Sequence, residues 1–400
     1  MAIQVTVQNR FQIIVPVRFD RAVRGFPVLD APDVDDRGWV NNRAAGLKMT
    51  DARGALVGIT VGDTVRLKVV REDIDDAVPL FVTNTGAQIR VAAPAGGGPI
   101  PADGVFSVTA LSDQAAGSKL QVRLGSADGP VIGEADVQTF TVLTLNITPH
   151  ICTIHQAATE AQGTGGWPGV NGARLDDGVL KQIFDVARAI WRPAGIDLHV
   201  APALPETYTG FGRDDFASAD RSHGSSEQNR VIRQNQKGDC CNMYFIRNMD
   251  QSVGISVHQE NRESEGLSQS GSIIAVEGSS VDDKGQHIVP RGTAGMELIQ
   301  NLGSDVAHEL GHFLTLSHVD KVNFPGLPDT YSRRRLMHPS SVLPDADEPP
   351  TAVSMPRFND IGYGTYHHGC LVTLKDHPTD STDGEVAIVR KRFRSTSLYL

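Results

Sequence analysis

The segment HELGHFLTLSH, residues 308–318, places three histidines and one glutamate within eleven residues. On an α-helix, side chains four residues apart lie one above the other, so His308 and His312 would present their imidazoles from one face. His318 follows six residues later, and on a continuous helix it would lie about 9 Å further along the axis. If all three rings are to reach one point, the helix must end soon after His312 and the chain must turn back.

Imidazole nitrogens at this spacing are suited to zinc, which in catalytic sites keeps one position for water. Zinc lowers the pKa of such a water to about 7, and a neighbouring carboxylate can take its proton. Glu309 would lie about 100° around the helix from His308, so it would lean over the water without binding the metal. These residues predict hydrolysis of an amide bond, with Glu309 as the catalytic general base.

A second segment, RRLMHPS at 334–340, follows downstream. Together the two segments resemble the metzincin zinc peptidases, whose signature is HExxHxxGxxH followed by a methionine turn. The resemblance covers about residues 146–395. It implies Zn²⁺ held by His308, His312 and His318, and it makes Met337 the floor beneath the metal rather than a ligand.

Two positions depart from the metzincin pattern. Thr315 stands where the family has glycine, and a β-branched residue adopts a left-handed backbone only at a cost. Either the turn is made differently or the third ligand is displaced, in which case Asp320 is the substitute. Pro339 stands where many members carry a tyrosine two positions after the methionine, which puts a tyrosine-assisted mechanism in doubt.

Residues 1–145 have a different texture, with short segments in which β-branched and polar residues alternate between turns rich in Gly, Pro, Asp and Asn. Evenly spaced strands without a helical period predict an all-β sandwich. The architecture, though no motif, resembles the immunoglobulin-like modules of bacterial surface and secreted enzymes. We expect this module to dock or target the enzyme, the alternative being that it covers the cleft. The expected strands are 56–70, 79–84, 87–93, 104–111, 119–125 and 138–147.

Residues 146–400 mix helices and strands, so the fold class is multidomain: a sandwich followed by an α/β (α+β), metzincin-like domain. The clearest unit is a helix and then a strand within 175–200, where Pro193 ends the helix and Gly195 suits the turn. A helix should carry the HELGH segment, and Thr382 should cap a last helix. Further strands are expected at 147–155, 241–246 and 271–278, the last as the edge along which a substrate would lie.

The composition excludes several classes of partner. The formal charge is −10 and no basic face stands out, so nucleic acid is not expected. No apolar run reaches the roughly 20 residues of a membrane-spanning helix. The first residues alternate like a strand, without a basic leader and apolar core. We therefore expect secretion or delivery outside the cell without a cleavable signal, or alternatively a cytoplasmic protein.

The remaining metal-binding residue types carry weaker expectations. Four cysteines are too few for a disulfide scaffold and favour packed thiols, although one bridge stays open. His150 and His155 flank an apolar strand and are expected on the surface or in the packing. A second metal at His367 and His368 is disfavoured because adjacent residues seldom face one ion. Acidic residues near Asp33 are expected in a solvated loop rather than around calcium.

The predicted function is that of a zinc-dependent endopeptidase acting on a protein or peptide substrate. Two rivals remain open from the residues alone. One is a zinc hydrolase that cleaves peptidoglycan peptides or another amide. The other is a docking or structural component of a secreted or injected assembly, in which zinc only stabilises the fold; the presence of Glu309 argues against it, because a structural site needs no general base.

Overall fold

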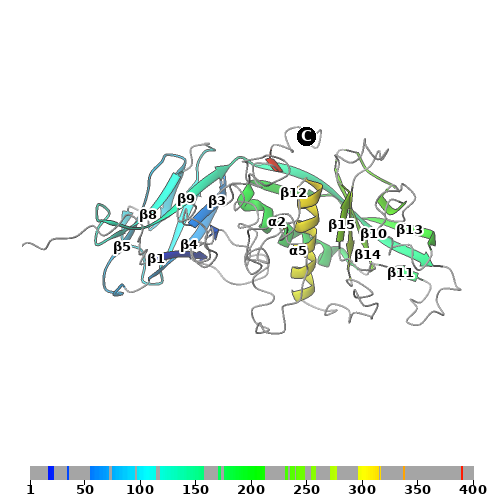
Figure 1. The fold of residues 1–400 in the computed structure, drawn as a ribbon, viewed down its shortest axis with the longest axis horizontal. Helices are drawn as coiled ribbons and strands as arrows, with labels where there is room; N and C mark the ends of the chain where they lie inside the picture. The colour runs from blue at the N-terminus through cyan, green and yellow to red at the C-terminus, as the bar shows by residue number, and fades with distance from the viewer. Residues whose placement is uncertain are drawn as a thin grey trace, which may run out of the picture.

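The structure is a computed structural model of the 400-residue chain. It describes residues 17–21, 34–35, 55–71, 74–94, 97–113, 118–156, 170–172, 175–211, 230–232, 235–238, 240–247, 254–257, 271–276, 296–314, 316, 337 and 389–390. These residues form a multi-sheet α/β protein with two largely antiparallel sheets, one largely parallel sheet and few helices (Figure 1).

Two sheets, here named A and B, pack around one hydrophobic core in the first part of the chain. Both contribute to it, for example through Leu67 and Phe106 of sheet A and Val57 and Leu120 of sheet B. Sheet A has the order β1 (Val17–Arg21), β4 (Thr64–Arg71), β7 (Val105–Ala110), β6 (Ile89–Ala93). Sheet B has the order β2 (Val34–Asp35), β3 (Ala55–Thr60), β9 (Val131–Phe140), β8 (Ser118–Leu124), β5 (Leu80–Asn84).

Most of the strands expected in this part are confirmed, but two expected segments are each divided. The segment 56–70 forms β3 and β4, which lie in different sheets, because Gly62 turns the chain with a φ of 90°. The segment 138–147 is divided by Thr141 and Val142 into the end of β9 and the start of the next strand. In both cases a connection of two or three residues is too short to interrupt the β-branched pattern.

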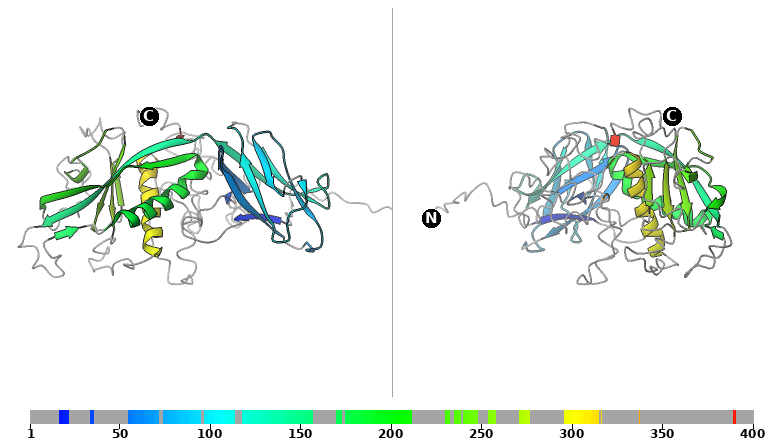
Figure 2. Two further views of the ribbon diagram at one scale, coloured as in Figure 1. Left: turned by 180° about the vertical axis from the view of Figure 1, so that it is seen from behind. Right: turned by 45° about the vertical axis from the view of Figure 1, so that its right-hand side comes forward.

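The third sheet, here named sheet C, is built around one long strand, β10 (Leu143–Gln156). Figures 1 and 2 show this strand running from beside sheets A and B to the far end of the molecule. Parallel to it lie β12 (Ile196–Val200), β13 (Leu204–Phe211) and β14 (Cys241–Ile246). Beyond β14 come β16 (Gly271–Ala275) and the antiparallel β15 (Gly254–Val257), while β11 (Val170–Gly172) pairs with the last part of β10 on the side opposite β13.

The prediction that the segment 271–278 is an edge strand is wrong. The segment 271–278 forms β16, which pairs with β14 on one side and with β15 on the other, so it lies inside the sheet. The strand at this end of the described sheet is β15. Its four residues are too few and too mixed to be recognised as a strand from their pattern alone.

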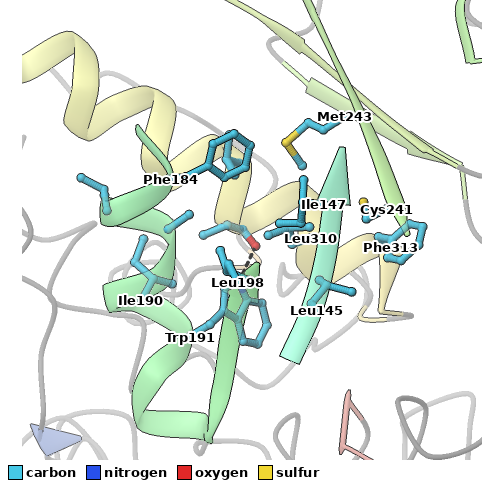
Figure 3. Packing of buried hydrophobic residues seen from close by; sticks show 14 of the residues in the cluster. Leu145, Ile147, Phe184, Ile190, Trp191, Leu198, Cys241, Met243, Leu310 and Phe313 are labelled. Carbon is cyan, nitrogen blue, oxygen red and sulfur yellow. Dashed lines mark hydrogen bonds between the residues drawn. The ribbon is translucent and has the colours of Figure 1, made fainter. Parts of the chain in front are cut away.

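Helices α2 (Asp177–Trp191) and α5 (Met296–Phe313) pack together over one face of sheet C. The helix-then-strand unit is confirmed: Asp176 caps α2, the short helix η4 (Arg192–Ala194) includes Pro193, and Gly195 follows with a φ of 72°. Figure 3 shows Phe184 and Trp191 of α2 beside Leu310 of α5. The Trp191 indole nitrogen donates to the Ala307 carbonyl at 3.2 Å, one residue before His308.

A polar joint ties sheet B to this helical layer. Arg192 forms two hydrogen bonds with Asp63, of 2.6 and 2.9 Å, from just beyond the end of α2 to the turn that follows β3. The Thr60 hydroxyl donates to the Arg192 carbonyl at 2.6 Å. Arg390 donates to the Gly195 carbonyl and lies over the Phe140 ring. The change from sheet B to sheet C falls close to the predicted boundary at 145, although the division into domains stays a prediction.

Among the helices that the structure describes, none is both long and apolar enough to cross a membrane. The C-terminal helix expected after Thr382 is described only at Val389 and Arg390, which are helical.

Candidate metal centre on helix α5

Helix α5 carries His308, Glu309 and His312 in its last two turns. The two imidazole rings lie with their centroids 4.7 Å apart and their planes at 84°. Both histidines are half-buried, whereas Glu309 is 5% exposed. The expected four-residue spacing therefore places both rings on one face of the helix, close enough for one small ion to contact them.

The helix ends directly after this pair. The Leu314 amide still bonds to the Leu310 carbonyl, but the Leu316 amide reaches back to the Gly311 carbonyl at 2.9 Å. A bond that spans six residues in this way is typical of the Schellman motif, in which the chain leaves the helix axis. Thr315, His318, Asp320 and Pro339 lie outside the described residues.

The same turn orients His312. Its Nδ1 lies 2.8 Å from the Leu316 carbonyl oxygen. Because a carbonyl only accepts, Nδ1 must carry the proton, and in a neutral imidazole the lone pair is then on Nε2. A hydrogen bond of this kind to the second nitrogen is what usually fixes the tautomer and direction of a metal-binding histidine.

Glu309 is enclosed by the edge of sheet C. The Ser256 hydroxyl of β15 lies 2.6 Å from Glu309 Oε2 and 2.9 Å from the Glu309 carbonyl oxygen. A second hydroxyl, Ser272 of β16, lies 2.7 Å from the first. Gly254 lies so close that a Cβ atom there would be 2.4 Å from Glu309 Oε1. The carboxylate therefore lies between α5 and β15, held by a serine hydroxyl and closely approached by the Gly254 backbone.

Met337 is fully buried against helix α5, next to Gly311. A Cβ atom on Gly311 would lie 2.3 Å from the Met337 sulfur, so the methionine uses the space that the glycine leaves. A glycine inside a helix costs about 1 kcal/mol relative to alanine, so a glycine within α5 is explained by a close contact at that position. That contact is the one with Met337.

The donor set fits zinc as far as the structure describes it. His308 and His312 offer two imidazole nitrogens on one face of α5, and the Glu309 carboxylate contacts Ser256 of β15. Within the described ranges, no group of three His, Cys, Asp or Glu side chains is placed to hold a metal. The predicted third ligand, His318, is outside those ranges and stays a prediction.

His150 has a different role from the helix histidines. It is fully buried, and its Nδ1 and Nε2 lie 2.9 Å from Glu206 Oε1 and 3.0 Å from Asn242 Oδ1. Its ring stacks on Tyr244. Both ring nitrogens thus lie at hydrogen-bonding distance from oxygen atoms. Of the two roles predicted for His150, on the surface or in the packing, the role in the packing is confirmed. His155 is in β10, but its side chain lies outside what the structure describes.

Two of the four cysteines are buried thiols, as the composition favoured. Cys152 and Cys241 are both fully buried, and burial raises the pKa of each thiol well above its ordinary value. Because the thiolate is the reactive and metal-binding form, neither is suited to be a ligand or nucleophile. Cys370, His367, His368 and the side chains near Asp33 lie outside the described residues.

Comparison with known proteins adds no family to these observations: no protein-family model matches the chain, and no curated protein matches it. The geometry of α5 and its surroundings therefore carries the functional argument. Three of the surrounding residues, Ser256, Gly254 and Leu316, had no sequence signal, because they reach the site from another strand or through a backbone atom.

Proposed function

We propose that this protein is a zinc-dependent endopeptidase of the metzincin type. The observation that carries the proposal is the end of α5: the helix with the HELGH segment stops at Phe313, and the turn after it supplies the carbonyl that orients His312. His308 and His312 would hold the zinc, and His318 would complete the set. Met337 would support the histidines from below.

When bound, zinc would supply a Lewis acid that polarises the scissile carbonyl and acidifies water. Glu309 would take the proton from the attacking water and pass it to the leaving nitrogen. Its burial and its bond to Ser256 support this role, because a general base must be held in one place while the substrate is bound. The His312 tautomer keeps Nε2 as the ligand atom.

The substrate we propose is a protein or peptide in extended form. β15 lies at the end of sheet C, in contact with the helix that carries Glu309. An extended peptide can add to such an edge through backbone hydrogen bonds. This geometry favours an endopeptidase over a hydrolase of a compact non-peptide amide.

The strand orders of sheets A and B support an immunoglobulin-like module in the first part of the chain. An immunoglobulin constant-type sandwich has the strands A, B, E and D in one sheet and C, F and G in the other. The orders β1-β4-β7-β6 and β5-β8-β9 have that arrangement if the strands are lettered along the chain with β3 as an extra A strand beside β9.

The test combines zinc content with peptide cleavage for the wild-type protein, His308→Ala and Glu309→Gln. We expect His308→Ala to lose zinc and activity, and Glu309→Gln to keep zinc while kcat falls at least about 1000-fold. His199→Ala is the matched control, because His199 is exposed on β12 and its Nδ1 lies 3.1 Å from Asn146 Oδ1. Full peptide hydrolysis by His308→Ala would refute the proposal.

The same samples separate the rivals. Cleavage products of a peptide library and of muropeptides would be compared by mass spectrometry, with and without a chelator. Activity on muropeptides alone would favour the peptidoglycan hydrolase. Bound zinc without any hydrolysis, and a Glu309→Gln protein that differs in no measurement, would favour a structural zinc.

A further inference from the structure

We infer that Ser256 is a positioning residue for Glu309, and that strand β15 holds the carboxylate through Ser256 while Gly254 leaves room for it. The inference rests on the proposed function, in which Glu309 is the general base. It adds a residue from the opposite side of the site, on an element that the HELGH segment does not include.

The hydrogen-bond geometry determines which hydroxyl donates. Both acceptors on Glu309, the carboxylate Oε2 at 2.6 Å and the backbone carbonyl oxygen at 2.9 Å, only accept, so the single hydroxyl proton of Ser256 is directed at Glu309, with Oε2 as the shorter contact. Ser256 Oγ then accepts from Ser272 Oγ at 2.7 Å. Ser272 is fully buried on β16, an interior strand. The contact on Glu309 is thus anchored in the body of sheet C.

Gly254 restricts the other carboxylate oxygen. It lies two residues before Ser256 on β15, and a Cβ atom there would come within 2.4 Å of Glu309 Oε1 and 2.9 Å of its Cγ. One oxygen is therefore bound by a hydroxyl and the other lies against backbone. Because alternate residues of a strand face the same side, Gly254 and Ser256 approach Glu309 together.

This arrangement gives β15 two roles in the proposed reaction. A peptide added to the edge of sheet C would take its register from β15. The same strand sets the position of Glu309. The base and the scissile bond would then be placed by one rigid element, which is the condition for efficient proton transfer.

The experiment uses the full chain and the variants Ser256→Ala, Ser256→Thr and Gly254→Ala, with Ser107→Ala on β7 as the control. We expect Ser256→Ala to lower kcat on a peptide substrate about 10- to 100-fold, the usual effect of losing such a supporting contact. KM should change less than about twofold, because the contact acts on the base and not on bound substrate. Zinc content should be unchanged.

Two further variants keep the test specific. Ser256→Thr retains the hydroxyl and should restore most of the lost kcat. Gly254→Ala should lower kcat by at least as much as Ser256→Ala, because its methyl group forces the Glu309 carboxylate to move. Ser107→Ala, half-buried on a strand of sheet A, should match the wild type.

A stability measurement tests the contact without enzyme activity. Ser256→Ala should lower the Tm of the wild-type protein by more than it lowers that of the Glu309→Ala protein, because the carboxylate is then missing while the contacts of Ser256 with the residue-309 carbonyl and with Ser272 remain. Equal Tm losses in both backgrounds would overturn the inference. So would an unchanged kcat, or a KM increase at constant kcat, which would mean that Ser256 contacts substrate.

The two proposals fail in different ways. If the wild-type protein hydrolyses no peptide, the proposed function fails, and the Tm comparison still decides whether Ser256 holds Glu309. If the wild type is active and Ser256→Ala is equally active, only the positioning role is refuted.

Discussion

The Ser118 hydroxyl is buried at the start of β8 without a hydrogen-bond partner in the described part of the chain. A buried hydroxyl that makes no hydrogen bond loses its hydration without compensation. We expect Ser118→Ala to raise the free energy of unfolding by about 1 kcal/mol, measured by urea denaturation. A decrease of similar size would show that the hydroxyl has a partner.

Some residues of the candidate site can be predicted from the sequence alone, and others cannot. His308, Glu309 and His312 follow from a spacing that a helix converts directly into proximity. Gly311 carries a weaker signal, because a glycine inside a helix needs a reason. Ser256 carries none: its closeness to Glu309 depends on β15 lying against α5, and no local pattern specifies that pairing.

At the scale of elements, α2 and α5 approach each other closely at Gly303. A Cβ atom there would lie 2.4 Å from Val186 Cβ and 2.9 Å from the Ile183 carbonyl oxygen. We expect Gly303→Ala to destabilise the protein by about 1–3 kcal/mol through overpacking, despite the better helix propensity of alanine. Chemical denaturation measures the effect. Gly178→Ala in the exposed first turn of α2 is the control, and equal effects would contradict the close packing.

Prediction of elements from the sequence succeeds where the pattern is local. The helix and strand in 175–200 follow from apolar periodicity, a capping aspartate and Gly195. The prediction of the edge strand is wrong because the residues 271–278 have a strong β pattern, whereas those of β15 have a weak one. A buried interior strand has a longer apolar run than an edge strand, so pattern strength points to the interior and away from the edge.

For the whole molecule, the joint between Arg192 and Asp63 is the contact to test. The Asp63 hydrogen bond raises the pKa of Arg192, which is about one-third exposed. Because solvent screens such a pair, we expect Asp63→Ala to lower the free energy of unfolding by about 1 kcal/mol. The loss should largely vanish in an Arg192→Ala background. Urea denaturation of the two single variants and the double variant measures this coupling.

Asp76→Ala is the control for this cycle, because Asp76 is almost fully exposed and lies 3.9 Å from Arg71. We expect it to leave the free energy of unfolding within about 0.5 kcal/mol of the wild type. Strictly additive losses for Asp63→Ala and Arg192→Ala would mean that the two side chains do not stabilise the joint together.

Two neighbouring residues, Trp191 and Arg192, connect helix α5 with the turn after β3 in sheet B. Arg192 donates a hydrogen bond to Asp63 in the turn after β3, and Trp191, one position earlier, donates one to the carbonyl of Ala307, the residue before His308. These contacts join sheet B to the helix that carries the HELGH segment. Under the proposed function, a molecule attached to a surface through sheets A and B would present α5 and β15 in one direction, and its substrates would have to arrive from that side.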